Sequence, residues 1–131
     1  MSDKRPERVY GVLVRDGRVF LASTGGELGL PGGVFRPLAE DRKVELRAHL
    51  AEQLGIAARN VWAQGAFGYR APGEEAERFS GFYTVWNWDG DVAAEAGAWL
   101  DREQVQWLPS LAPSIRILLL SILDTVALKT R

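Results

Sequence analysis

The fold of this chain is decided by a glycine-bearing loop that leads into an amphipathic helix. The stretch reads Leu30-Pro31-Gly32-Gly33, then Glu40, and then His49-Leu50-Ala51-Glu52-Gln53-Leu54-Gly55-Ile56. Leu46, Leu50 and Leu54 recur every four residues, which predicts a helix with one buried stripe. We expect this helix over residues 40–54, ending before Gly55, which occupies the position of a left-handed C-cap. The loop glycines permit positive φ and a close approach of the backbone.

Strands and a second helix surround this segment in the sequence. Asp16-Gly17 separates two β-rich runs and is a dipeptide favoured in two-residue turns, so a hairpin opens the fold. Pro113 suits the first position of a final helix. The predicted strands cover residues 9–14, 19–22, 61–69, 78–88 and 105–108, and the final helix covers residues 114–129. Several strands with two helices predict an α/β (α+β) fold in which helices cover a mixed sheet.

Composition limits the class of protein. The 131 residues are 47% hydrophobic and 25% charged, which is typical of one globular domain over residues 1–131. The net charge of −1 gives no overall attraction to nucleic acid or to an anionic membrane, and neither is expected as a partner. Cysteine is absent, which fits a reducing compartment. Residues 1–7 are polar, lack the apolar run of a signal peptide and are expected to be poorly ordered. We therefore expect a cytoplasmic protein.

The glycine loop, the glutamate after it and the helix that ends in Glu52-Gln53-Leu54-Gly55-Ile56 resemble the Nudix hydrolase family. The resemblance also takes in the opening hairpin, the later strands and the C-terminal helix. It implies an α/β/α sandwich and attack of water on a nucleoside diphosphate linked to another group, with Mg²⁺ or Mn²⁺ as cofactor. A divalent ion suits this chemistry because it neutralises phosphate oxygens and acidifies water. Glutamates one turn apart on a helix place their carboxylates on one face, where such an ion can bind.

Several charged positions of the family's box are replaced in this chain. Counting back from Gly55, Ala48 stands at the position of the box's arginine, and His49 stands at that of its first helix glutamate. Glu52 and Gln53 occupy the positions of the paired glutamates, and Glu40 occupies that of the leading glutamate. The loop before Glu40 is then one residue longer than the family's spacing. Only Glu52 remains as a carboxylate among the helix positions. Gln53 offers a neutral oxygen, and histidine suits softer metals than magnesium.

A second register counts forward from Gly33. It places Arg47 on the arginine position and Glu52 on the second of the paired glutamates, but it loses the leading glutamate, the aliphatic position and the closing glycine. We prefer the first register because it keeps the leucine stripe and the Gly55 cap, which are packing constraints. The one-residue insertion that it requires in a loop costs little.

The candidate site residues follow from the box and from the loop after residue 69. The catalytic candidates are Glu52, Glu40 and His49, the metal-binding candidates are Glu52, Glu45, His49 and Gln53, and the substrate-binding candidates are Gly32, Gly33, Tyr69 and Arg70. Glu45, His49 and Glu52 share a helix face and could form a displaced metal site. Outside the box, Glu75, Glu77 and Glu103 are candidates for a further carboxylate. The plainer interpretation makes His49 and Glu45 exposed helix residues and Glu40 a favourable charge at a helix N-terminus.

Three hypotheses for function remain open at this point. In the first, the protein binds or acts on a nucleoside diphosphate-linked ligand, and its hydrolase activity is weak or lost because the box is incomplete. In the second, it is an active metal-dependent hydrolase with a rearranged metal site. In the third, it is a non-catalytic interaction or regulatory domain. The final helix is apolar on more than one face, and we predict that its second face forms a homodimer contact.

Overall fold

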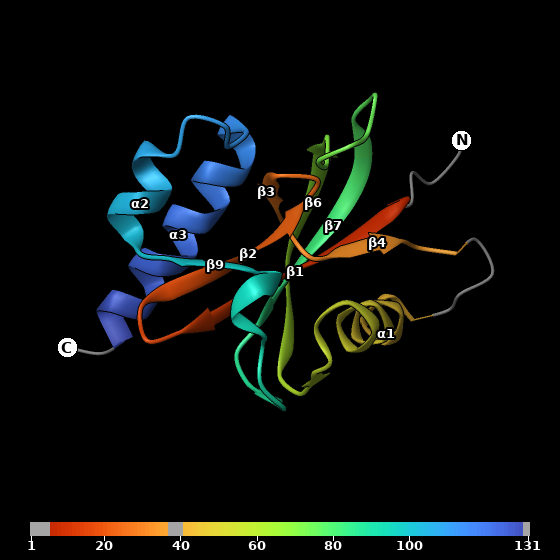
Figure 1. The fold of residues 1–131 in the computed structure, drawn as a ribbon, viewed down its shortest axis with the longest axis horizontal. Coiled ribbons are helices and arrows are strands. Elements are labelled where there is room, and N and C mark those ends of the chain that lie inside the picture. Colours follow the sequence, from red (N-terminus) through yellow and green to blue (C-terminus); the bar gives the residue numbers. More distant parts are fainter. Residues whose placement is uncertain (1–5, 37–40, 130–131) are drawn as a thin grey trace.

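The computed structural model describes residues 6–36 and 41–129. Figure 1 shows a twisted sheet with α1 on one side and α2 and α3 on the other. The strands are β1 (Arg8–Arg15), β2 (Arg18–Thr24), β3 (Glu27–Gly29), β4 (Gly32–Val34), β5 (Ala57–Ala58), β6 (Val61–Tyr69), β7 (Arg78–Val85), β8 (Trp88–Asp89) and β9 (Gly97–Leu100). The helices are α1 (Arg42–Leu54), α2 (Arg102–Trp107) and α3 (Pro113–Lys129), with one 3₁₀ turn, η1 (Ala94–Ala96). The α/β/α arrangement is the predicted one.

The sheet is mixed because β1 has both parallel and antiparallel neighbours. Its strand order is β3-β2-β1-β7-β6, with β4 also paired to β1 and β9 also paired to β2. β1 runs parallel to β7 and antiparallel to β2 and β4. The β1–β2 hairpin turns at Asp16-Gly17, whose φ angles of 52° and 72° are both positive, as a type I′ turn requires. The predicted opening hairpin is therefore confirmed.

Two hydrophobic cores lie on the two faces of the sheet. Alternate residues of β1 enter each of them, as the two-residue period of a strand dictates. The core beside α2 and α3 contains Tyr10, Val12, Leu21, Phe82, Ile115 and Leu119. The core beside α1 contains Val9, Leu13, Leu46, Leu50, Leu54 and Val85. β1 is thus buried on both faces, and it fixes the position of the loop and helix that follow it.

α1 begins and ends at residues that satisfy its free backbone groups. The Asp41 carboxylate accepts a hydrogen bond from the Lys43 N–H at 2.8 Å, which makes it the N-cap. Gly55 has a φ of 69°, and its N–H donates to the Ala51 carbonyl at 3.0 Å. Leu46, Leu50 and Leu54 are buried. The left-handed cap and the leucine stripe are therefore confirmed.

The short strands β3, β4 and β5 were not predicted, and three further elements differ from the sequence predictions. Residues 105–108, predicted as a strand, lie almost entirely in α2, because Asp101 and Gln104 form a capping box that starts a helix at Arg102. β9, which pairs with β2, lies in a segment to which no element was assigned. The strand expected over residues 78–88 ends at Val85, and Trp88 pairs instead with β5.

The final helix begins at Pro113, as predicted. At the other end of the chain, Pro6 is buried and the Glu7 N–H donates to the Phe79 carbonyl at 2.7 Å. The remainder of the segment expected to be poorly ordered lies outside the described residues. Within the described ranges, no helix is long and apolar enough to cross a membrane.

Candidate functional site

The glycine loop approaches β1 so closely that Gly32 has no room for a side chain. Gly32 lies opposite Tyr10 in the antiparallel pairing of β4 with β1. It has a φ of 144°, and a Cβ atom built on it would lie 2.0 Å from the Val9 carbonyl oxygen. The Gly11 N–H donates to the Pro31 carbonyl at 2.9 Å and holds the start of the loop on the sheet. A glycine is therefore required at position 32.

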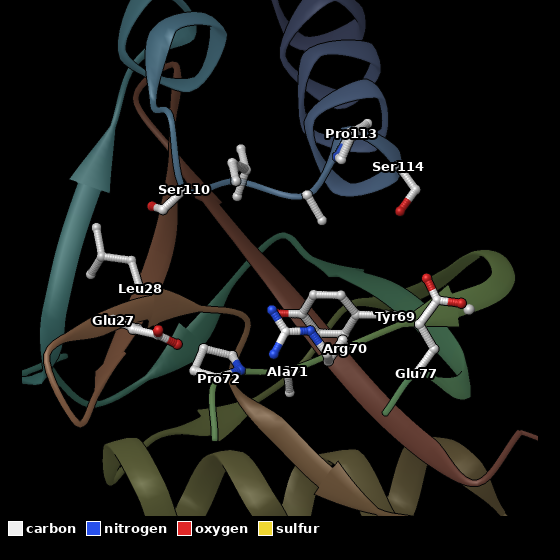
Figure 2. Close-up of a pocket in the computed structure, with 13 residues that line it drawn as sticks. Glu27, Leu28, Tyr69, Arg70, Ala71, Pro72, Glu77, Ser110, Pro113 and Ser114 are labelled. Carbon is white, nitrogen blue, oxygen red and sulfur yellow. The ribbon is translucent and has the colours of Figure 1, made fainter. Parts of the chain in front are cut away.

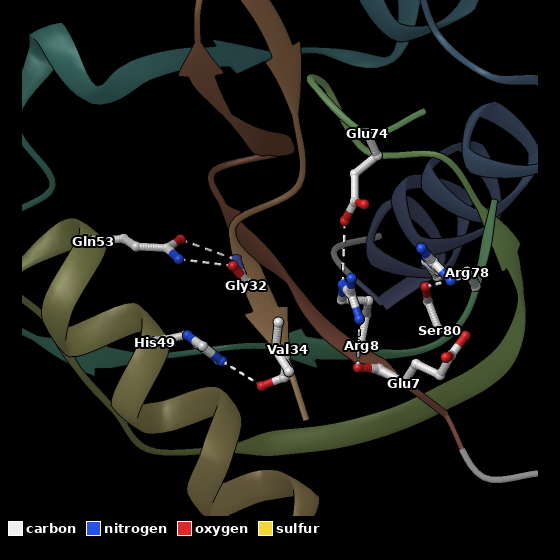
Figure 3. A network of polar contacts seen from close by, with 9 residues as sticks. All are labelled: Glu7, Arg8, Gly32, Val34, His49, Gln53, Glu74, Arg78 and Ser80. Carbon is white, nitrogen blue, oxygen red and sulfur yellow. Dashed lines mark hydrogen bonds and ion pairs between the residues drawn. The ribbon is translucent and has the colours of Figure 1, made fainter. Parts of the chain in front are cut away.

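Gln53 fastens α1 to this loop through both polar atoms of its amide. Nε2 donates to the Gly32 carbonyl oxygen at 2.7 Å, and Oε1 accepts from the Gly32 N–H at 3.0 Å (Figure 3). One side chain thus satisfies the backbone donor and the backbone acceptor of one residue, as a neighbouring strand does. A carboxylate has no N–H to donate, so only an amide can make both contacts.

His49 makes a parallel contact one turn earlier on α1. Its Nε2 lies 2.8 Å from the Val34 carbonyl oxygen. Because a carbonyl oxygen only accepts, Nε2 carries the proton of this hydrogen bond. A Cβ atom on Gly33 would lie 3.0 Å from Cε1 of the ring, so the imidazole packs closely against the loop backbone. His49 and Gln53 together bind the loop at two points.

The two remaining glutamates of the helix differ in environment. Glu45 is only 5% exposed and forms an ion pair with Arg36, at 2.5 Å between Nε and Oε1. It is therefore a buried partner of the loop after β4, and its interpretation as an exposed helix charge is wrong. Glu52 is exposed. Glu40 lies outside the described residues.

The described residues do not fit the magnesium site that the resemblance implies. Magnesium prefers several oxygen ligands in octahedral geometry. Of the predicted set, His49 and Gln53 use the polar atoms that face the loop to bind its backbone, and Glu45 is held by Arg36. Glu52 is the one carboxylate of the set that faces solvent. In the described part of the chain, no three His, Asp or Glu residues come together as a metal site would require.

A cavity of about 290 Å³ lies beside the glycine loop, and we call it the loop cavity. It is lined by Arg8, Tyr10, Ala22, Thr24, Leu30, Pro31, Gly32, Gly33, Val34, Gln53, Ala71, Pro72 and Glu74. Arg8 and Glu74 are the charged residues among the described residues of this lining, and they form an ion pair at 3.2 Å between Nε and Oε1. Figure 3 shows this pair across β4 from His49 and Gln53. The predicted residues Gly32 and Gly33 both border this cavity.

Two buried tyrosines, Tyr10 of β1 and Tyr69 of β6, lie next to the glycine loop. The rings of Tyr10 and Tyr69 meet edge to face, with centroids 5.0 Å apart. The Tyr69 hydroxyl accepts from the Leu30 N–H at 3.4 Å. Burial raises the pKa of Tyr10, Tyr69 and Glu74 raise it further, and Arg8 opposes them. Burial also raises the pKa of Tyr69. Both hydroxyls are therefore protonated and neutral at physiological pH.

A second cavity, of about 350 Å³, lies between β3, the end of β6 and the start of α3, and we call it the Tyr69 cavity. Figure 2 shows the side chains of Tyr69 and Arg70 in its lining, with Pro113 and Ser114 from α3 opposite them. Glu27 and Glu77 also line it. It shares Ala71 and Pro72 with the loop cavity, so the two cavities adjoin.

The structure separates the predicted site residues that it describes into four groups. Glu45 and His49 line neither cavity and bind Arg36 and Val34. Gly32, Gly33 and Gln53 line the loop cavity, whereas Tyr69, Arg70 and Glu77 line the Tyr69 cavity. The exposed residues Glu52, Glu75 and Glu103 line neither. The sequence reasoning missed Arg8, Tyr10 and Glu74. The several glutamates in residues 70–78 could have pointed to Glu74 as a functional residue. Nothing in the sequence indicated that this loop contacts the first strand.

Comparisons with known proteins agree on the fold. No protein-family model matches the chain, and no curated protein matches it. A MutT NUDIX hydrolase from Burkholderia pseudomallei is 22% identical, with a TM-score of 0.68 over 89% of this chain and 97% of that one. A MutT structure from work on Aliivibrio salmonicida and Vibrio cholerae is 18% identical, with a TM-score of 0.70 over 89% of this chain and 97% of that one.

One further match is to a protein whose structure was solved with DNA. NrtR of Shewanella oneidensis, in a structure complexed with a 27mer DNA, is 18% identical with a TM-score of 0.59 over 89% of this chain and 58% of that one. With the mixed sheet and the glycine loop fastened to α1, these matches show that the chain has the fold of the MutT and Nudix hydrolases.

Proposed function

We propose that this protein binds a nucleotide-type ligand that carries a diphosphate, and that its hydrolase activity is weak or lost. The observation that carries the proposal is the pair of hydrogen bonds between the Gln53 amide and Gly32. Gln53 stands where the resemblance places a metal-binding glutamate, and here it binds the backbone of the loop instead. His49, at the position of another such glutamate, does the same with Val34.

The two adjoining cavities support a ligand with a charged part and an organic part. The loop cavity offers the Arg8 guanidinium, and guanidinium groups bind phosphate oxygens in a planar, bidentate manner. The Tyr69 cavity offers an aromatic ring and Arg70. A diphosphate in the loop cavity would place the group attached to it near Pro72, where the Tyr69 cavity begins.

Weak hydrolysis follows from the loss of charge at the helix. Water attacks a diphosphate slowly unless positive charge neutralises the phosphate oxygens and lowers the pKa of the water. A single exposed carboxylate, Glu52, holds a divalent ion poorly because it supplies one of the several oxygen ligands that such an ion needs.

The second candidate function is an active hydrolase with a rearranged site for Mg²⁺ or Mn²⁺ that uses Glu52, either Glu40 or Glu45, and His49. The exposure of Glu52 on α1 favours it. A non-catalytic interaction or regulatory domain is the third candidate, and the likeness in fold to NrtR, which was solved in complex with DNA, favours it. The net charge of −1 argues against DNA as the partner of this chain.

A thermal-shift panel separates these proposals. Ligands that bind the folded state raise its apparent stability, so we expect nucleoside diphosphate derivatives to raise the melting temperature equally well with and without Mg²⁺ or Mn²⁺. The same compounds are then screened for turnover. Robust, metal-dependent turnover that disappears in Glu52→Gln would establish the second function and refute the first. If no compound raises the melting temperature, the third candidate, a non-catalytic interaction or regulatory domain, is the one that remains.

We also propose a homodimer through the outer face of α3. Ile117 on this helix is 70% exposed, and Trp107 at the end of α2 is 71% exposed. Large apolar side chains at this exposure are typical of contact surfaces when they lie together. Light scattering should report a dimer that Ile117→Glu dissociates. A wild-type monomer at high concentration would contradict this assembly.

A further inference from the structure

The loop cavity contains a cation that is already paired with an anion of the same chain. Arg8 and Glu74 are separated by 66 positions in the sequence, and their side chains meet at 3.2 Å. Among the described residues that line this cavity they are the two charged ones, and their formal charges cancel. A neutral cavity attracts a polyphosphate weakly, whereas one with a free guanidinium attracts it strongly.

Arg8 is held in place by the sheet. It is the first residue of β1, and its backbone is paired with Val34 of β4 on one side and with Ser80 of β7 on the other. Its side chain is only 18% exposed, and Nη1 also donates to the Glu7 carbonyl at 3.2 Å. The guanidinium is therefore a fixed part of the cavity wall.

Glu74, by contrast, belongs to the turn between β6 and β7. The backbone of this turn is anchored. The Pro72 ring packs on Gly29, where a Cβ atom would lie 2.6 Å from Cδ of the proline. The Glu74 N–H donates to the Ala71 carbonyl at 3.0 Å, and Arg70 donates to the Glu74 carbonyl at 3.3 Å. Rotation of the Glu74 side chain is then enough to release Arg8, without movement of the turn.

We propose that Glu74 acts as an internal anion that occupies Arg8 in the ligand-free protein, and that a ligand phosphate binds Arg8 by displacing the Glu74 carboxylate. This inference rests on the proposed function and states which class of ligand can bind Arg8 in the loop cavity. A diphosphate carries more charge than one carboxylate and offers several oxygens to the guanidinium, so it displaces Glu74. A neutral nucleoside has no group that competes for Arg8. Glu74 therefore lets only those anions reach Arg8 that carry more charge than one carboxylate, and it lowers the affinity for anions without affecting a neutral ligand.

The test compares three single variants with the wild type, with inorganic pyrophosphate and ADP as probes in titration calorimetry. Glu74→Gln keeps the shape of the side chain and removes its charge, so both probes should bind about tenfold more tightly, a change of about 1.4 kcal/mol. Arg8→Gln should weaken both by about tenfold or more. Glu75→Gln is the matched control, because Glu75 is an exposed neighbour in the same turn and lines neither cavity.

The double variant Glu74→Gln/Arg8→Gln completes a double-mutant cycle. If Glu74 acts through Arg8, the gain from Glu74→Gln disappears when Arg8 is absent. A gain that persists in the double variant, or that Glu75→Gln reproduces, would show a general effect of charge and overturn the inference. Circular dichroism melting of each variant verifies that it is folded at the temperature of the titration.

Failure of this inference can be told apart from failure of the proposed function. If ADP binds the wild type and the three single variants with equal affinity, ligand binding stands and the proposed role of Glu74 is refuted. If neither the wild type nor Glu74→Gln binds ADP or pyrophosphate, both proposals fall. Adenosine serves as the neutral probe, and its affinity should not change in Glu74→Gln.

Discussion

At the scale of single residues, glycine and glutamine decide the geometry of the candidate site. Gly32 lets the loop backbone reach β1, and Gln53 joins this backbone to α1. Neither role depends on charge. Gly32 and Gln53 thus fix the shape of the loop through backbone conformation and hydrogen bonds.

Gly32→Ala should prevent stable folding or cost more than about 3 kcal/mol, because the new Cβ would overlap the Val9 carbonyl oxygen at a φ that alanine avoids. Gly25→Ala is the matched control. Gly25 also has a positive φ, of 56°, but has nothing within 4 Å of the added Cβ, so its cost should be about 1–2 kcal/mol. Urea unfolding of both variants measures the difference, and equal costs would show that the loop can move away from β1.

Gln53→Glu should destabilise the protein by about 1–2 kcal/mol, because the Gly32 carbonyl loses its donor and faces a carboxylate oxygen. The new carboxylate stands one residue from Glu52, so Mn²⁺ should recover part of the lost stability in this variant and none in the wild type. Glu52→Gln is the control, with unchanged stability because Glu52 is exposed. Equal stability of Gln53→Glu and the wild type without metal would refute the role of the amide.

At the scale of elements, α2 shows how a short helix is held by its ends. A six-residue helix is unstable in isolation. Asp101 and Gln104 cap its start. The Arg116 guanidinium donates to four carbonyls at and beyond its end, among them those of Val105 at 2.9 Å and Leu108 at 2.8 Å. The β-prone residues of this segment are helical because these two ends outweigh local propensity.

Arg116→Lys should cost about 2–3 kcal/mol, because one ammonium cannot reach carbonyls that a planar guanidinium contacts from two nitrogens. The measurement is the urea midpoint together with hydrogen exchange of the α2 amides, which should accelerate more than those of α1. Arg102→Gln is the control: its guanidinium is exposed and pairs with Asp124, so the midpoint should hardly move. A variant Arg116→Lys with wild-type exchange in α2 would contradict the assignment.

At the scale of the whole molecule, local patterns predicted the elements that local forces form. The Asp16-Gly17 hairpin, the Leu46 to Leu54 stripe and the Gly55 cap depend on residues close in sequence, and the structure contains all of them. The Arg8–Glu74 pair could not be predicted, because it exists only after β1 and β7 pair in parallel. Gln53 was predicted only as a metal ligand, and its donor and acceptor roles toward Gly32 depend on the exact approach of the loop to α1.

Both cores should unfold in one transition, because β1 and β7 contribute residues to each of them. Leu50→Ala on the α1 side and Leu119→Ala on the α3 side should each cost about 2–5 kcal/mol. Tryptophan fluorescence and far-ultraviolet circular dichroism should give coincident transitions in both variants. Separate transitions in either variant would show that the two layers fold independently.

The Gln53 amide has a consequence for how the protein responds to the ionic state of its surroundings. A loop that is joined to its helix by an ion comes apart when a chelator removes that ion, and its ligand affinity then follows the supply of free metal. Here the junction is formed by hydrogen bonds from a side chain of the same polypeptide. We therefore expect the shape of the loop cavity to depend on hydrogen bonds within the chain and to be unchanged by a chelator.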